Sequence, residues 1–303
     1  MKVCFFTWQF LPIQGGQEYG LHYLANALGH MGHEVVVLTR KWPQPRSVDK
    51  TKVPSGRYKV RYFRWLRSKG LLDNYLAGYY LRRAHRRFGF DVILAKMAWP
   101  AGYFAAAHKE SLGVPLVIGV VGIDILKQPE LGRGFRLISP KVERQIQQAL
   151  GRADAVLAYT PSLQAAAVEA GAPENRTAVM PNGVDFTAYQ KVTAVKHTSP
   201  YILSIGRFVS VKGHDVLLRA FRIVAKKVPD LQLVLVGGGP VPQEYYRLVQ
   251  ELGVAERVKF IEFVAGEEKV ALLQGCVVLA QPSRSDHQIR SPELRRSSGW
   301  IST

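Results

Sequence analysis

Short apolar runs alternate with longer amphipathic stretches along most of this chain. The runs are four to seven residues long and end at glycine, proline or polar residues, as buried strands do. Between them, stretches such as Tyr19 to Met31 repeat apolar residues every three or four positions, which is typical of helices. This alternation predicts an α/β fold with parallel sheets. The expected strands are residues 3–6, 35–38, 92–95, 114–118, 155–158, 178–181, 201–205, 231–236, 258–264 and 276–280.

The pattern is interrupted once and then restarts. Residues 192–200 are polar and have no apolar period, and the alternation resumes at Tyr201. We therefore expect two Rossmann-like domains, residues 1–191 and 201–285, joined by a linker over 192–200. In such folds the ligand cleft lies at the carboxyl ends of the strands. Residues 286–303 show neither period and are rich in Arg and Ser, which predicts a disordered tail.

The charge balance changes the picture more than the overall composition does. The 303 residues are 47% hydrophobic, but 41 Lys and Arg face only 23 Asp and Glu, which gives a net charge of +18. The segment from Arg40 to Lys96 alone holds 16 basic and 3 acidic residues. Such a field favours an anionic partner: nucleic acid, an acidic membrane face or a phosphorylated substrate.

Within this basic segment, residues 57–67 alternate cations with apolar and aromatic side chains, and a helical stretch with a cationic end follows. One interpretation is a strand with a solvated face and a helix with a solvated basic end. The other is a docking surface for anionic lipid headgroups, with Trp65 at the interface. A non-catalytic nucleic-acid binder is a third alternative. The cations at the helix end are Arg82, Arg83, Arg86 and Arg87.

The cysteines and the apolar runs bear on location. Cys4 and Cys276 both lie in strand-like apolar runs and look like small buried hydrophobes, which fits a reducing compartment. The first residues do not resemble a signal peptide, and no run reaches the roughly 20 apolar residues of a spanning helix. We expect a cytoplasmic protein with a peripheral position on the inner face of the cell membrane.

The richest chemistry lies between Gly206 and Asp215. A predicted strand ends in a glycine turn with two cations, and a predicted helix begins directly afterwards. Free N–H groups at a helix start favour anions. Arg207 can fork onto phosphate oxygens and Lys212 can add a point charge, so the segment suits a diphosphate. The plainer alternative is a strand-to-helix turn with two solvated cations.

Other turns offer weaker signals. Gly15 and Gly16 follow the first strand, where their N–H groups could approach a phosphate, and a second glycine turn, Gly237, Gly238 and Gly239, follows the strand at 231–236. Both are also explained by tight turns. Asn182 could form an Asx turn or line a cleft. No metal-ligand motif, nucleophile elbow or P-loop occurs. The first turn lacks Gly-x-Gly-x-x-Gly spacing, which weakens a dinucleotide-dependent dehydrogenase as an alternative.

Taken in order, these segments resemble the retaining family 4 glycosyltransferases of the GT-B fold, from Met1 to about Ser285. The matching segments are residues 15–18, 24–28, 32–35, 180–185, 204–215, 236–240 and 282–285.

The resemblance implies two Rossmann-like domains facing a cleft. It also implies transfer of a sugar, with retention, from a nucleotide-sugar donor to a glycan or lipid-linked acceptor, without a metal or a further cofactor. Arg207 and Lys212 would stabilise the leaving diphosphate, and Gly16 would bring backbone N–H groups to it. Donor contacts are further expected at Gly15, Asn182 and residues 237–239.

Two departures from the family pattern concern the site. Where the family has His-Gly-x-Asp, this chain has Val121 and keeps only Asp124 as a candidate catalytic residue. After Ser285 the family continues into a Glu-x7-Glu helix; here Asp286 holds the first position and Leu294 the second. We therefore expect a truncated or frame-shifted second domain with strand order 3-2-1-4. Its apolar strand at 276–280 would then be an uncovered edge of the sheet. We expect such a protein to be poorly soluble and its activity to be doubtful.

Overall fold

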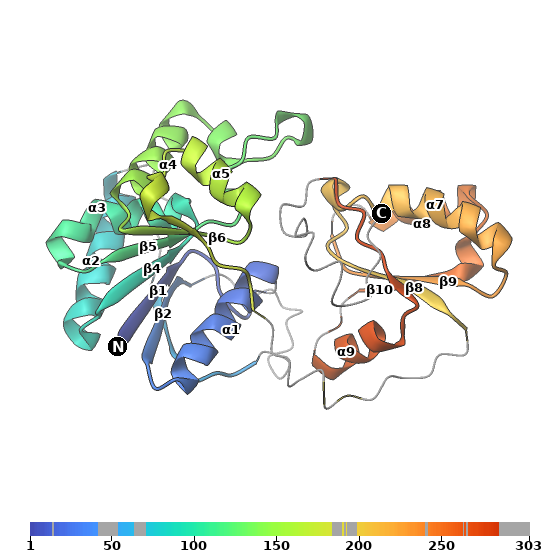
Figure 1. Cartoon of the computed structure of the whole chain (residues 1–303), viewed down its shortest axis with the longest axis horizontal. Coiled ribbons are helices and arrows are strands. Elements are labelled where there is room, and N and C mark those ends of the chain that lie inside the picture. The colour runs from blue at the N-terminus through green and yellow to red at the C-terminus, as the bar shows by residue number, and fades with distance from the viewer. Residues whose placement is uncertain are drawn as a thin grey trace. The chain divides into compact units, whose positions relative to one another are not determined.

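In the computed structural model the chain divides into two compact units, Met1–Val184 and Asp185–Thr303 (Figure 1). The structure describes residues 1–13, 15–41, 54–63, 71–183, 190, 192, 199–239, 242–262, 264 and 266–284. Most of the predicted linker, 192–200, and all of the predicted tail, 286–303, lie outside the described residues. The predicted domain borders therefore stay predictions.

The first unit is built on a sheet of seven parallel strands in the order β3-β2-β1-β4-β5-β6-β7. The α/β prediction is confirmed, and the basic segment does contain a strand, β3, at the edge of the sheet, as the first of its three interpretations required. The strands are β1 (Lys2–Thr7), β2 (Glu34–Arg40), β3 (Lys59–Phe63), β4 (Val92–Lys96), β5 (Leu116–Gly119), β6 (Ala155–Ala158) and β7 (Thr177–Val179).

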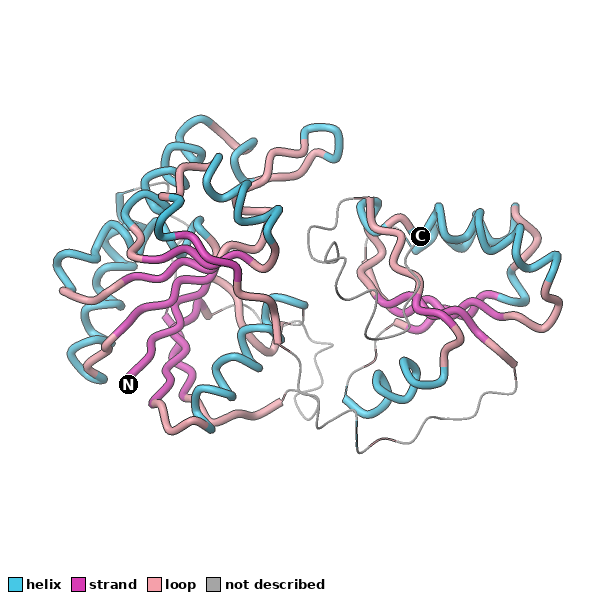
Figure 2. Tube along the Cα trace, in the orientation of Figure 1, coloured by secondary structure: helices cyan, strands magenta, loops and turns pink. Residues whose placement is uncertain are grey.

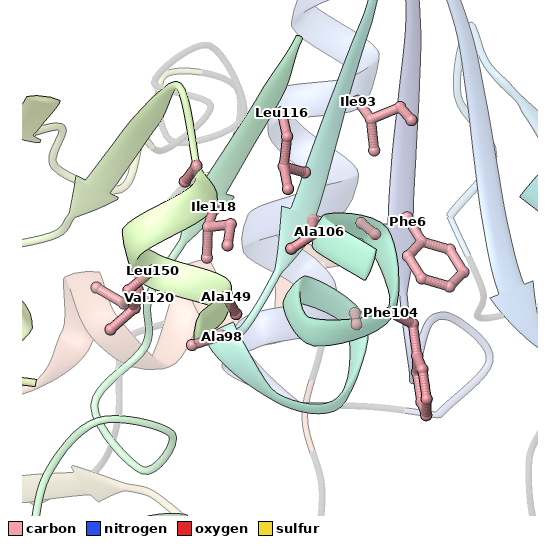
Figure 3. Close-up of a cluster of buried hydrophobic side chains, with 14 of the residues drawn as sticks. Phe6, Ile93, Ala98, Phe104, Ala106, Leu116, Ile118, Val120, Ala149 and Leu150 are labelled. Atoms are coloured by element: carbon pink, nitrogen blue, oxygen red, sulfur yellow. The ribbon is translucent and has the colours of Figure 1, made fainter. Parts of the chain in front are cut away.

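Helices cover both faces of this sheet because successive side chains of a buried strand point to opposite faces. Val3 and Phe5 of β1 pack against α1, and Phe6 packs on the opposite face with the other helices. Figure 2 shows the backbone of this arrangement, with helices on both sides of the first sheet. Figure 3 shows that second core, in which Phe104 and Leu150 lie over the sheet. The helices are α1 (Gly16–His30), α2 (Leu71–Phe88), α3 (Tyr103–Leu112), α4 (Pro140–Arg152) and α5 (Pro161–Glu169).

Two of these helices begin at the same sequence signal, a hydroxyl residue followed by proline. Ser139 accepts a hydrogen bond from the N–H of Val142 at 3.2 Å, and Thr160 accepts one from the N–H of Leu163 at 3.2 Å. The side chain satisfies a donor that the first helical turn leaves free, and the proline has no donor to lose. These caps fix where the chain enters α4 and α5.

The second unit holds a parallel sheet in the order β10-β9-β8-β11, which confirms the predicted order 3-2-1-4. Leu233 and Leu235 of β9 face α7 and α8, and Val234 and Val236 face α9. The strands are β8 (Tyr201–Ile205), β9 (Gln232–Val236), β10 (Val258–Ile261) and β11 (Val278–Leu279), and the helices are α7 (His214–Lys227), α8 (Pro242–Glu251) and α9 (Gly266–Gly275).

Strand β11 is an edge of the second sheet within the described part of the chain. Val277 and Val278 are 64% and 39% exposed there. The predicted apolar edge is therefore present, and such an edge offers unpaired backbone groups to other strands.

Candidate functional site

The predicted diphosphate site lies on the loop between β8 and α7. Gly206 donates its N–H to the carbonyl of Val236 at 2.8 Å, which ties the loop to the end of β9. Arg207 follows and is exposed, while Phe208 turns inward and is 2% exposed. The loop therefore presents the guanidinium at the carboxyl edge of the sheet, and Phe208 anchors it in the core.

Lys212 closes a single 3-10 turn on the same loop. Its Nζ donates to the Ser283 hydroxyl at 3.3 Å, which joins the segment after β11 to the loop. Gly213 follows with φ of 66°, and α7 begins with no side-chain cap on its first turn. A Cβ at Gly213 would lie 2.2 Å from the carbonyl oxygen of Pro282, so only glycine fits between these loops.

The glycine turn after β9 is mostly explained by contacts inside the unit. A Cβ at Gly237 would lie 1.9 Å from the Gly206 carbonyl oxygen, and one at Gly239 would lie 2.4 Å from that of Phe208. A Cβ at Gly238 would meet nothing closer than 3.9 Å. Packing inside the unit therefore explains why Gly237 and Gly239 are glycines, but it does not explain Gly238. Gly238 is the residue of this turn that best fits a role in binding the donor.

A buried histidine packs against the β8–α7 loop on the side of the core. His214, the first residue of α7, is 1% exposed and packs edge-on against Phe208, with ring centroids 5.1 Å apart. Its Nδ1 has no hydrogen-bond partner among the described residues. Burial, with a smaller effect from the Lys212 ammonium, lowers the pKa of His214 to about 4, so the ring is neutral near pH 7.

In the first unit the corresponding turn lies between β1 and α1. Gly15 caps the helix in an extended conformation, and its Cβ would fall 2.4 Å from Glu18 Oε2. A Cβ at Gly16 would meet nothing within 4 Å, so the backbone is open there. The Oδ1 of Asn182 lies 3.2 Å from where a Cβ of Gly20 would stand. The fold thus brings Asn182 to α1.

Asp124 has a structural task. Its side chain is fully buried and accepts hydrogen bonds from three backbone N–H groups, those of Ala98 at 2.7 Å and of Val121 and Gly122 at 3.0 Å. Burial raises the pKa of Asp124 in spite of these bonds. The carboxylate ties the loop after β4 to the loop after β5, and its oxygens are directed at the backbone.

The sequence analysis missed Lys96, the last residue of β4. This lysine is 7% exposed, and its Nζ lies 4.3 Å from the centroid of the Tyr159 ring. Burial outweighs the charges of Asp124 and Glu18 and lowers the pKa of Lys96 to about 8. A lysine that continues an apolar strand to its carboxyl end was the signal that could have found it.

The four arginines at the basic end of α2 differ in exposure. Arg82 is half-buried and its Nη1 lies 3.4 Å from His108 Nδ1 on α3. Arg83, Arg86 and Arg87 are exposed. The predicted interfacial Trp65 and the predicted catalytic Asp286 lie outside the described residues.

Metal clusters and membrane-spanning helices are both absent from the described residues. No group of three or more His, Cys, Asp or Glu side chains there is arranged to hold a metal ion. None of the described helices is both long and apolar enough to cross a membrane.

Family models match nearly the whole chain. The model for Glycosyltransferase Family 4 matches residues 14–188, and the model for Glycosyl transferases group 1 matches residues 185–288. Neither the nucleic-acid binder nor the dehydrogenase of the sequence analysis finds support in these matches.

Curated relatives carry glycosyltransferase names. A GDP-mannose-dependent alpha-(1-6)-phosphatidylinositol monomannoside mannosyltransferase of Mycobacterium tuberculosis is 24% identical over 94% of this chain and 73% of its own length. A D-inositol 3-phosphate glycosyltransferase of Nocardia farcinica is 28% identical over 68% of this chain and 49% of its own length. The mannosyltransferase of Mycolicibacterium smegmatis is 38% identical over 28% of this chain. The chain spans between 22% and 73% of the length of these relatives.

Solved structures share the fold. Anabaena Alr3699/HepE in complex with UDP has a TM-score of 0.70 and 23% identity, covering 94% of this chain and 75% of that one. The sucrose-phosphate synthase of Thermosynechococcus elongatus has a TM-score of 0.73 and 19% identity, covering 93% and 75%. These likenesses confirm the predicted fold. Because the family 4 model alone covers more than half of its residues, the chain belongs to glycosyltransferase family 4.

Proposed function

We propose that this protein transfers a sugar from a nucleotide-sugar donor to a glycan or lipid-linked acceptor, with retention of configuration and without a metal ion. The observation that carries the proposal is the loop from Gly206 to Gly213. It presents an exposed Arg207 and a Lys212 held by Ser283 directly before the uncapped start of α7. Two cations and a helix N-terminus at one strand end suit a diphosphate.

The proposed chemistry follows from where charge develops. The bond between the anomeric carbon and the diphosphate oxygen breaks, and its electron pair moves onto the diphosphate. The acceptor hydroxyl oxygen forms the new bond on the same face of the sugar, and its proton passes to the departing diphosphate oxygen. Arg207 and Lys212 stabilise the growing negative charge, which is the largest catalytic task at such a site. Asp286, at a position that resembles the family's donor-sugar carboxylate, would orient the sugar.

Backbone groups complete the proposed donor site. A Cβ at Gly16 would meet nothing within 4 Å, and one at Gly238 would meet only Glu262, at 3.9 Å, so a phosphate can approach the N–H groups of both glycines closely. Gly15, Gly237 and Gly239 shape the turns that hold these two. Asn182, against Gly20, would contact the donor from the first unit. Asp124 would act by holding the loops after β4 and β5.

The experiment uses the full chain with UDP-glucose and GDP-mannose, the donors that the names of its relatives suggest. We expect one of the two to bind and to be hydrolysed slowly in the absence of an acceptor. Arg207→Ala and Lys212→Ala should each lower this turnover roughly 100-fold, as loss of one charge-stabilising donor does. Arg222→Ala, an exposed cation on α7, is the matched control and should have no effect. EDTA should also leave turnover unchanged.

Two results would contradict the proposal. One is a well-folded protein that binds neither nucleotide sugar nor UDP nor GDP. The other is equal turnover in the Arg207 and Lys212 variants and in the Arg222 control, because the two cations would then have no part in the reaction.

We further propose that the protein works at the inner face of the cell membrane and docks there through one face of the first unit. Exposed residues follow one stripe of α2: Leu72, Tyr75 and Tyr79 first, then Arg83 and Arg86. Strand β3 adds exposed cations beside it, since Phe63 and Tyr80 join strand and helix at 5.6 Å between ring centroids. Aromatic side chains next to arginines suit an anionic lipid surface. We call this stripe, with the exposed Arg87, Lys59 and Arg61, the docking face.

A further inference from the structure

The side chain of Lys96 is 7% exposed and lies at the carboxyl edge of the first sheet, where a ligand of this fold would bind. In the strand register Lys96 lies between Thr7 of β1 and Gly119 of β5. A Cβ at Gly119 would already stand 3.9 Å from the Cδ of Lys96, so the missing side chain leaves room beside the lysine stem. Lys96 is therefore held at the end of a central strand and does not lie on a surface loop.

This buried cation lacks a hydrogen-bonded counter-ion. Its Nζ lies over the face of the Tyr159 ring, and no hydrogen bond or ion pair to its Nζ occurs among the described residues. Asp124 is close enough to act on its charge, but its carboxylate is occupied by three backbone N–H groups. Glu18 acts on it more weakly. An ammonium has three donors, so an anionic ligand could accept hydrogen bonds from it.

The backbone directly after Lys96 has an unusual conformation that hydrogen bonds hold in place. Met97, the next residue, has φ of 78°, the one non-glycine residue with positive φ in the described part of the chain. Its N–H donates to the carbonyl of Gly119 at 2.8 Å, and its carbonyl accepts from Gly102 at 3.0 Å. Strained residues fixed from several sides are found mostly at functional sites. The strain therefore points to a task for the lysine beside it.

We propose that Lys96 is a positioning and specificity residue that binds a phosphate group carried by the acceptor. This rests on the function proposed above, in which Arg207 and Lys212 of the second unit hold the donor diphosphate. Lys96 belongs to the other unit and is a compact point charge with free donors, which suits an anion better than a neutral sugar. Names of two relatives, which refer to inositol phosphate and to a phosphatidylinositol mannoside, fit such an acceptor.

The test compares wild type with Lys96→Met, which keeps the volume and removes the charge, and with Lys96→Gln as a second variant. Lys141→Met, an exposed lysine of the same unit, is the control. Glycerol 3-phosphate, glycerol and a nucleotide serve as probes in calorimetric titrations of the full chain, the nucleotide being UDP, or GDP if GDP-mannose is the donor that wild type binds. We expect wild type and control to bind glycerol 3-phosphate, and both Lys96 variants to lose at least about 10-fold in affinity, as the loss of a charge-assisted hydrogen bond implies. Glycerol should not bind, and nucleotide affinity should stay within about twofold.

The probes separate the ways in which the proposal can fail. Equal affinity of wild type and Lys96 variants for glycerol 3-phosphate, or no binding by wild type, overturns it. Loss of nucleotide affinity in the variants, with glycerol 3-phosphate unaffected, assigns the lysine to the donor diphosphate instead and also overturns it. Failure of the proposed function is a different result, since wild type would then bind no nucleotide at all. Lys96→Met should fold as well as wild type, because it removes a buried charge without leaving a partner unpaired.

Discussion

At the scale of the residue, Asp124 is predicted to act through folding. Its carboxylate collects the N–H groups of Ala98, Val121 and Gly122, which belong to two different loops. An asparagine side chain at this position would turn an N–H group toward some of these donors, so Asp124→Asn should lower the free energy of unfolding by about 1–3 kcal/mol. Denaturant unfolding followed alongside transferase activity checks this.

The control for this prediction is Asp154, an exposed carboxylate that accepts the N–H of Leu116 at 2.7 Å and the Lys109 ammonium at 2.6 Å. Asp154→Asn should cost less, because water can replace the lost partners of an exposed group. If Asp124→Asn instead abolished activity at unchanged stability, Asp124 would be a residue that touches the substrate.

Single residues also show how far sequence reasoning reached into the site. Arg207 and Lys212 could be found because they interrupt a strand-glycine-helix pattern that has a known affinity for phosphate. Lys96 had only its place at the end of an apolar strand as a signal, since its burial and its contact with Tyr159 arise from β4 and β6 lying in one sheet although the two residues are far apart in sequence. Gly237 and Gly238 received the same prediction from the sequence. Only the packing separates them, because a Cβ at Gly237 would clash with the Gly206 carbonyl oxygen and a Cβ at Gly238 would meet nothing closer than 3.9 Å.

At the scale of the element, the docking face makes α2 the helix to test. Replacing Arg83, Arg86 and Arg87 by Gln should weaken binding to phosphatidylglycerol vesicles roughly 100-fold, at about 1 kcal/mol for each cation near an anionic surface. Arg82→Gln should change binding little, because Arg82 is half-buried against His108. A co-sedimentation assay at fixed salt measures both.

Total charge is the competing explanation, and a second triple variant tests it. Arg219, Arg222 and Arg247 are exposed cations of the second unit. Their replacement by Gln changes the net charge equally and should leave vesicle binding near the wild-type value. An equal loss of vesicle binding in both triple variants would mean that the net charge of +18 attracts the membrane as a whole. Helix α2 would then not be a specific membrane-binding surface.

Elements were the scale at which the sequence was most informative. Strands of a parallel sheet are buried on both faces, so they appear as unbroken apolar runs and are hard to miss. Their ends were less accurate: the strand expected at 114–118 is β5, Leu116–Gly119. Strand β3 stayed ambiguous because it is an edge strand with exposed Lys59 and Arg61, which is also how a solvated or docking segment looks.

At the scale of the whole molecule, the two units have separate cores and carry differently perturbed titratable groups. The pKa of Lys96, in the first unit, is lowered to about 8, and that of His214, in the second, to about 4. Acid should therefore act on the second unit through His214, and also on the first unit through His22, whose pKa burial lowers as well. A buried neutral histidine gives stability that is fully present above pH 6.5, the ordinary histidine value, and that is lost as the pH falls toward 4, because the unfolded chain binds the proton first.

The last prediction uses this difference. Between pH 6.5 and 4 the free energy of unfolding of the second unit should fall by up to about 3 kcal/mol on account of His214. His214→Phe, which keeps a ring against Phe208, should remove this dependence, while the buried His22 of the first unit stays in both proteins and cancels in the comparison. Trp8 and Trp99 lie in the described part of the first unit, so their fluorescence follows that unit, and far-ultraviolet circular dichroism follows both units. We expect the dichroism of wild type to show a transition in denaturant that moves to lower concentration as the pH falls, ahead of the fluorescence transition. Equal pH dependence in wild type and His214→Phe would show that His214 is protonated in the folded protein as easily as in the unfolded chain.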